Sequence, residues 1–118
     1  MLKIYHNPRC SKSRTGLQYL NEKKLNVDVV EYLKDPLKYD DLKKLLVKLH
    51  IKPHELVRTQ EELYKKEYKG KNFTDDEWIK IIAENPSLMK RPLIEREHGA
   101  VWGDTVESIE NFLTIKTK

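Results

Sequence analysis

The sequence contains a single cysteine, Cys10, and this scarcity limits its chemistry more than any other feature of its composition. One cysteine cannot form a disulfide within the chain. A lone cysteine without a secretion signal indicates the reducing cytosol, where a thiol is either a small apolar core residue or a nucleophile. Two Met and two Trp add nothing that suggests a bound cofactor. We therefore expect a cytoplasmic protein whose chemistry depends on one thiol.

Long apolar runs are also lacking. No N-terminal stretch resembles a signal peptide and no segment approaches the length of a membrane span, so we expect no membrane association. The 118 residues fit one compact domain, residues 1–118, with 38% hydrophobic and 36% charged residues. The net charge of +4 comes from lysines interspersed with Asp and Glu, which is typical of a solvated surface.

The densest basic stretch comprises Lys65, Lys66, Lys69 and Lys71. An exposed helix end explains it better than a nucleic-acid patch, because no nucleic-acid-binding motif accompanies it. Nucleic acid is therefore not an expected partner.

The N-terminal third predicts a β-α-β unit. Leu2 to Tyr5 is a short apolar run that ends at a turn containing Pro8, and Ser11 to about Asn21 is helical. Val27 to Tyr32 is rich in β-branched and aromatic residues and predicts a second strand. So short a unit favours two parallel strands joined by a right-handed crossover.

The middle of the chain is predicted to be helical. Leu42, Leu45, Leu46 and Leu49 share one face of a helix. Pro53 can open a short helical turn that leads to Arg58. Two capping boxes are predicted, at 59–62 and 74–77. The helix after the second box is expected to stop at Asn85-Pro86 and to bury three side chains: Trp78, Ile81 and Ile82.

The C-terminal part predicts a hairpin and a last helix. Residues 92–94 and 100–102 form its strands, with Gly99 in the turn. Asp104 and Glu107 form an N-cap pattern for the helix. That helix is expected to present four side chains to the core: Val106, Ile109, Phe112 and Leu113.

Cys10 lies between the turn at Pro8 and the first turn of the first predicted helix. Unpaired backbone N–H groups and the macrodipole favour an anion there, so the thiolate should be stabilised. The Ser13 hydroxyl can donate to the sulfur. Positive potential is expected from Arg9, Lys12, Arg14 and, when protonated, His6. A buried apolar cysteine fits less well, because polar residues surround Cys10 on both sides.

The spacing Cys10-x-x-Ser13 decides how an oxidised Cys10 can be reduced. A second cysteine at position 13 would resolve a mixed disulfide within the molecule, and a serine cannot. The rescuing thiol must therefore come from outside, from glutathione or a partner protein.

The segment from Ile4 to Arg14 resembles the glutaredoxin-type arsenate reductase family, ArsC. The resemblance covers essentially the whole chain, and its segments follow in order at the family's spacing. These are Arg58 with residues 60–64, then 73–76, Asn85-Pro86, 91–94, and Gly103 with Glu107.

The resemblance implies an α/β, thioredoxin-like fold: a four-stranded mixed sheet with an inserted helical segment. It also implies an enzyme whose Cys10 thiolate attacks arsenate. Glutathione then attacks the thiol–arsenic adduct and glutaredoxin releases arsenite, without a metal or a tightly bound cofactor. His6 and Ser13 would tune the thiolate, while Arg58 and Arg91, helped by Arg9 and Lys12, would hold the oxyanion.

The same resemblance places a cis-proline, Pro92, opposite Cys10, so we expect the Arg91–Pro92 bond to be cis. One position departs from the family. Its third anion-binding arginine follows a glycine, and here the pair is Gly103-Asp104. This carboxylate predicts weak or absent arsenate reduction.

Two other hypotheses remain open. One is a binding protein like the Spx regulators, which share the fold and contact RNA polymerase. Their redox switch uses a Cys-x-x-Cys pair, which Cys10 and Ser13 cannot form. The other is a family member that keeps the thiol without turnover.

Overall fold

The computed structural model describes residues 2–114, and the chain divides into two compact units. The first comprises Met1–Asp35 with Arg91–Lys118, and the second comprises Pro36–Lys90. Each unit is described by itself. The expectation of one domain over residues 1–118 stays a prediction.

The first unit contains a four-stranded mixed sheet in the order β2-β1-β3-β4. Strand β1 (Leu2–Tyr5) pairs in parallel with β2 (Val27–Val30), and β3 (Leu93–Arg96) runs antiparallel to both β1 and β4 (Gly99–Trp102). The predicted parallel pair and hairpin are therefore confirmed. Two boundaries differ, because β2 ends before Tyr32 and Gly99 opens β4 after a turn at residues 97–98.

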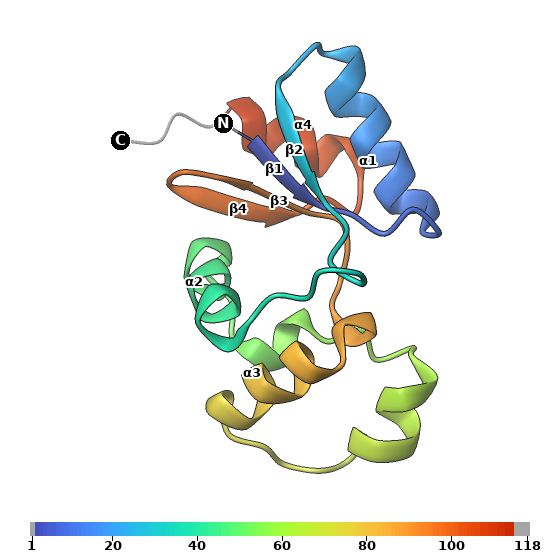
Figure 1. Cartoon of the computed structure of the whole chain (residues 1–118), viewed down its shortest axis with the longest axis vertical. Helices are drawn as coiled ribbons and strands as arrows, with labels where there is room; N and C mark the ends of the chain where they lie inside the picture. Colours follow the sequence, from blue (N-terminus) through green and yellow to red (C-terminus); the bar gives the residue numbers. More distant parts are fainter. Residues whose placement is uncertain (1, 115–118) are drawn as a thin grey trace. The chain divides into compact units, whose positions relative to one another are not determined.

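Helices α1 (Ser11–Glu22) and α4 (Val106–Thr114) lie side by side on one face of this sheet (Figure 1). The buried cluster between them and the sheet consists of Leu2, Ile4, Leu20, Ile94, Ile109 and Phe112. A Cβ atom on Gly103 would lie 2.9 Å from Cγ1 of Ile109, so only glycine lets the end of β4 approach α4 this closely. Val106, expected in the core, is 37% exposed.

Thr105 caps α4, which corrects the predicted role of Asp104. The Ser108 N–H donates to Oγ1 of Thr105 at 3.0 Å. Asp104 instead accepts a hydrogen bond from the Ser108 hydroxyl at 3.2 Å. Asp and Thr are both favoured residue types at helix N-caps. With Thr105 as the cap, α4 begins one residue later than the Asp-x-x-Glu pattern predicted.

The second unit is built from α2 (Tyr39–Leu49), α3 (Asp75–Glu84), two 3₁₀ turns (Pro53–Leu56 and Pro86–Leu88) and a π-helical turn, Tyr64–Tyr68. On the predicted apolar face of α2, Leu42, Leu45 and Leu46 are buried, whereas Leu49 is only half-buried. The lysines at 65, 66, 69 and 71 are exposed, on the π-helical turn and just after it.

One of the two predicted capping boxes is confirmed. The Glu77 N–H donates to Oγ1 of Thr74 at 3.2 Å, and the Thr74 N–H donates to Oε1 of Glu77 at 2.8 Å. Thr59 caps no helix, because residues 59–61 form a turn and the helical segment that leads into the π-helical turn begins only at Glu62. Helix α3 ends at Asn85-Pro86 as expected, but it buries Ile79 rather than Ile81 beside Trp78 and Ile82.

Candidate active site at Cys10

Cys10 occupies the N-cap of α1 with an extended backbone (φ −95°, ψ 123°). Its N–H donates to the carbonyl of Asn7 at 3.0 Å, and its own carbonyl accepts from the Arg14 N–H at 3.0 Å. Both backbone groups are therefore engaged, one by the preceding turn and one by the helix. This arrangement sets the half-buried thiol beside the free N–H groups of the first helical turn.

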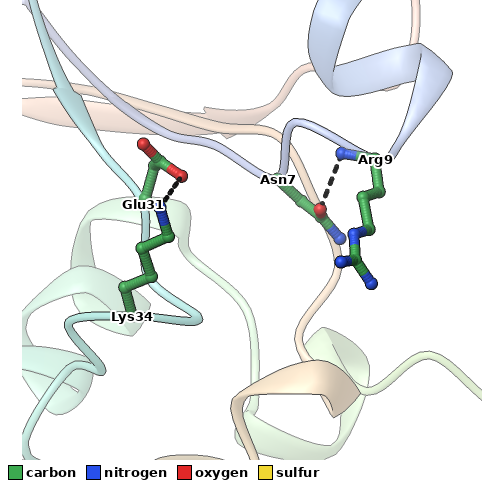
Figure 2. A network of polar contacts seen from close by, with 4 residues as sticks. All are labelled: Asn7, Arg9, Glu31 and Lys34. Atoms are coloured by element: carbon green, nitrogen blue, oxygen red, sulfur yellow. Dashed lines mark hydrogen bonds and ion pairs between the residues drawn. The ribbon is translucent and has the colours of Figure 1, made fainter.

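The loop between β1 and α1 is shaped by its own polar groups. The Asn7 side chain accepts from the Arg9 N–H at 3.0 Å (Figure 2). Arg14 donates from Nη1 to the Pro8 carbonyl at 3.0 Å. Arg14 thus braces the loop. The assignment of Arg9 to oxyanion binding stays a prediction.

Ser13 is fully buried, and its hydroxyl contacts two groups on the far side of the loop. Its Oγ lies 2.6 Å from Nδ1 of His6 and accepts the Asn7 N–H at 3.0 Å. The expectation that this hydroxyl donates to the sulfur is therefore corrected. Ser13 acts on Cys10 through its backbone N–H.

The pKa of the Cys10 thiol lies below its ordinary value. Burial raises this pKa, but the hydrogen bond from the Ser13 N–H, the Arg91 side chain and the Lys12 N–H together lower it further. The charge of Arg91 adds to the same effect. Arg91 is thus the cation that acts on the sulfur, and the thiolate is favoured as the sequence predicted.

His6 is buried, and its pKa lies below the ordinary value of 6.5. Burial lowers the pKa of His6 and Arg14 lowers it further, which outweighs the raising effect of Glu31. Glu31 is itself paired with Lys34 at 3.5 Å (Figure 2). A lowered pKa reduces the protonated fraction of His6, and the positive potential expected from its protonated form stays a prediction.

Arg91 enters the site from the segment that precedes β3. The Arg91–Pro92 peptide bond is cis, which confirms the prediction. A Cβ atom on Gly16 of α1 would lie 3.2 Å from Cγ of Pro92, so this segment packs directly against the helix. The Gly103 N–H donates to the Pro92 carbonyl at 2.8 Å.

Trp102, the last residue of β4, is a part of this site that the sequence did not reveal. Its Nε1–H donates to the Arg91 carbonyl at 3.2 Å. The Lys12 ammonium lies over its ring, 5.6 Å from the centroid. The sequence feature that could have indicated this contact is the position of Trp102 directly before Gly103, at the end of a strand predicted to pair with the one that follows Pro92.

Residues 5–112 match the sequence model of the ArsC family. The chain belongs to the ArsC family. The arsenate reductase of Neisseria meningitidis serogroup A is 36% identical over 114 residues, which cover 95% of this chain and 97% of that protein.

Two solved structures of the ArsC type have the same architecture. An arsenate reductase from Vibrio cholerae superposes with a TM-score of 0.87 at 33% identity, over 92% of this chain and 95% of that one. A putative arsenate reductase from Yersinia pestis gives 0.85 at 36% identity, over 98% and 100%. The fold of this ArsC-family chain is accordingly thioredoxin-like, as the resemblance implied.

Arg58, expected to bind the oxyanion, lies in the second unit. Its N–H donates to the Leu88 carbonyl at 2.7 Å, and Val57 forms a β-bridge with Met89. Its Nη1 lies 3.3 Å from Oε2 of Glu61. The backbone of Arg58 is therefore fixed, and its approach to Cys10 stays a prediction.

Over residues 2–114, no group of three or more His, Cys, Asp or Glu side chains is arranged to hold a metal ion. Within the same range, no helix is both long and apolar enough to cross a bilayer. The chemical groups at the site are a thiol, an imidazole, a guanidinium and the backbone donors of one helix.

Proposed function

We propose that this ArsC-family protein is a thiol-dependent oxidoreductase of the arsenate reductase type. Its Cys10 thiolate attacks an oxyanion such as arsenate, and glutathione and glutaredoxin serve as external reductants. The observation that carries this proposal is the convergence of the Ser13 N–H, the Lys12 N–H and the Arg91 side chain on the Cys10 sulfur. Such a set of donors favours an anion both on the nucleophile and beside it.

The reaction requires the sulfur to form a bond to arsenic while one arsenate oxygen leaves as water. Glutathione then attacks arsenic, and a second oxygen leaves as water. A glutaredoxin thiol attacks the sulfur of the bound glutathione, which forms a mixed disulfide and leaves the electron pair on arsenic. Water finally displaces Cys10 from arsenic and releases arsenite. Arsenic gains two electrons in this sequence, and two thiols are joined as one disulfide. Arsenate, two thiols and their protons thus become arsenite, a disulfide and water, and Cys10 returns as a thiolate.

Each cation has a distinct task in this scheme. Arg91 stabilises the thiolate, and a guanidinium beside the nucleophile suits an oxyanion, which guanidinium groups bind through paired N–H donors. Arg58 is the second guanidinium that the family resemblance assigns to the oxyanion. Arg9 and Lys12, both exposed around the first turn of α1, would raise the local concentration of anions.

The external reductant follows from the residue at position 13. Ser13 stands where a resolving cysteine would be needed, and Cys10 is the one cysteine of the chain. An oxidised Cys10 can therefore be reduced only by a thiol from another molecule. Glutathione is the expected co-substrate and glutaredoxin the expected protein partner.

The test is arsenite formation by the purified protein with arsenate, glutathione and glutaredoxin. We expect slow arsenite formation that needs all three components and disappears in Cys10→Ser. A reaction with glutathione alone provides the background rate. If neither the native protein nor Asp104→Arg forms arsenite faster than Cys10→Ser, the proposed function is wrong.

A further inference from the structure

Trp102 touches both segments that place donors on the Cys10 sulfur. One is the first turn of α1, where Lys12 contributes its backbone N–H to the sulfur and its ammonium to the Trp102 ring. The other is the Arg91–Pro92 segment, whose carbonyl at Arg91 accepts the indole N–H at 3.2 Å. A single side chain on β4 therefore connects two elements that meet at the thiol.

We propose that Trp102 is a positioning residue of the thiol site, which holds the Lys12 ammonium over its ring at the end of β4 and fixes the backbone that carries Arg91. The inference goes beyond the reaction proposed above, since it concerns how the site is kept positive and not which oxyanion it reduces. The inference rests on the proposed function only where it predicts an effect of Trp102 on the turnover of an oxyanion.

The ring provides the first half of this task. Lysine is a flexible chain of four methylenes, and an ammonium on the surface normally moves among many positions. An aromatic face within about 6 Å of the charge attracts the ammonium through the ring quadrupole, and indole is the strongest of the aromatic side chains in this respect. At 5.6 Å from the Trp102 centroid, Lys12 is inside that range.

The indole N–H provides the second half. Gly103 follows Trp102 and donates to the Pro92 carbonyl at 2.8 Å. Two consecutive carbonyls, those of Arg91 and Pro92, are thus held by two consecutive residues at the end of β4. Because Arg91 donates from its side chain to the sulfur, any freedom of its backbone would weaken that bond.

The position of this tryptophan gives the arrangement a role in selectivity. The next residue but one is Asp104, whose carboxylate is bonded to the Ser108 hydroxyl at the start of α4. The end of β4 therefore carries a negative charge, and the Lys12 ammonium over the Trp102 ring adds a positive charge at the same strand end. Lys12 held in this way offsets Asp104 for an approaching anion.

The experiment measures the alkylation of Cys10 with two probes, neutral iodoacetamide and anionic iodoacetate. Both react with the same thiolate, so their rate ratio reports the positive potential at the sulfur. The pH midpoint of the iodoacetamide rate reports the pKa of the thiol. Neither readout needs arsenate turnover, so a failure of this proposal is distinct from a failure of the proposed function.

Two substitutions separate the two halves of the proposal. Trp102→Phe keeps an aromatic face and removes the N–H, so we expect the pH midpoint to rise by a few tenths of a unit while the rate ratio is largely kept. Trp102→Leu removes both, so the midpoint should rise and the iodoacetate preference should fall by about two- to fivefold. Lys12→Gln should lower the rate ratio by a similar factor.

A matched control lies at the other end of the same helix, where the Lys23 ammonium is 5.5 Å from the Tyr19 ring centroid. Lys23→Gln removes the same charge and the same kind of contact, and it should leave both readouts unchanged. The double variant Trp102→Leu/Lys12→Gln should lower the rate ratio no further than the more affected single variant does. If Trp102→Leu and Trp102→Phe both leave the ratio and the midpoint at native values, or if the double variant loses the product of the two single effects, the proposal is overturned.

Discussion

Ser13 acts on the thiol site through two different groups. Its backbone N–H reaches the Cys10 sulfur, whereas its hydroxyl is bonded to His6 and to the Asn7 N–H. A substitution that removes the hydroxyl should therefore change the loop more than the thiol. This distinction could not be read from the sequence, because the spacing Cys-x-x-Ser places both groups near the cysteine.

We predict that Ser13→Ala lowers the free energy of unfolding by about 1–3 kcal/mol, since it leaves the buried Asn7 N–H without its acceptor. The pH midpoint of Cys10 alkylation should change little, because the backbone N–H remains. Urea unfolding and alkylation kinetics measure the two effects. Ser11→Ala, on the exposed side of the same turn, is the control. Unchanged stability with a midpoint near that of a free thiol would contradict this division of roles.

His6 should make stability depend on pH. Its folded-state pKa is lowered from 6.5, chiefly by burial. As the pH falls below 6.5, the unfolded chain takes up the proton first, so the free energy of unfolding should decrease until the folded-state value is passed. Urea unfolding between about pH 7.5 and 5 would show the decrease, in a range above most carboxylate titration. His6→Gln should flatten the curve, whereas His98→Gln, on an exposed side chain, should not. A native curve that is flat or rises toward acid would refute the effect.

At the scale of elements, periodicity predicted most of the helices and strands, and the errors fall at their ends. Asp104 and Thr105 are both residue types favoured at N-caps, and in the structure Thr105 is the one that accepts the Ser108 N–H. Ile79 and Ile81 are two positions apart on α3, and tertiary packing selects the first for burial. Local patterns cannot resolve such choices, since each alternative satisfies the same rule.

The two predicted capping boxes offer a direct test at this scale. Thr74→Ala removes a formed box and should lower the free energy of unfolding by about 1 kcal/mol. Thr59→Ala alters the same sequence pattern where no helix begins, so its effect should stay within about 0.5 kcal/mol. Denaturant unfolding of both variants gives the comparison. Equal losses would mean that the segment after Thr59 is capped in solution.

At the scale of the whole molecule, the assembly of the site could be expected only through the family resemblance. Cys10 and Arg91 belong to the first unit and are 81 positions apart, a distance over which no periodicity carries information. The match over residues 5–112 confirms the family. The contacts of Trp102 with Arg91 and Lys12 could not be predicted, because its place at a strand end does not specify which side chains it meets.

Asp104 is expected to limit turnover in the whole enzyme. Replacing it with arginine should lower the KM for arsenate, since one unit charge at about 4 Å and an effective dielectric near 20 is worth about 4 kcal/mol as an upper limit. Solvent screening should reduce the gain. Loss of the Ser108 bond should also lower stability slightly, so unfolding is measured beside kinetics. Asp104→Asn removes the charge and keeps an acceptor for Ser108. It should lower the KM less than Asp104→Arg without the loss of stability. Rapid arsenate reduction by the native protein would contradict this account of Asp104.

The central claim is that Cys10 is held as a reactive thiolate by the start of α1 and by Arg91, and its alkylation rate as a function of pH tests this most directly. The predicted midpoint lies clearly below the value of about 8.5 for a free thiol, and Arg91→Gln should move it upward. A native midpoint at or above the free-thiol value would contradict the claim.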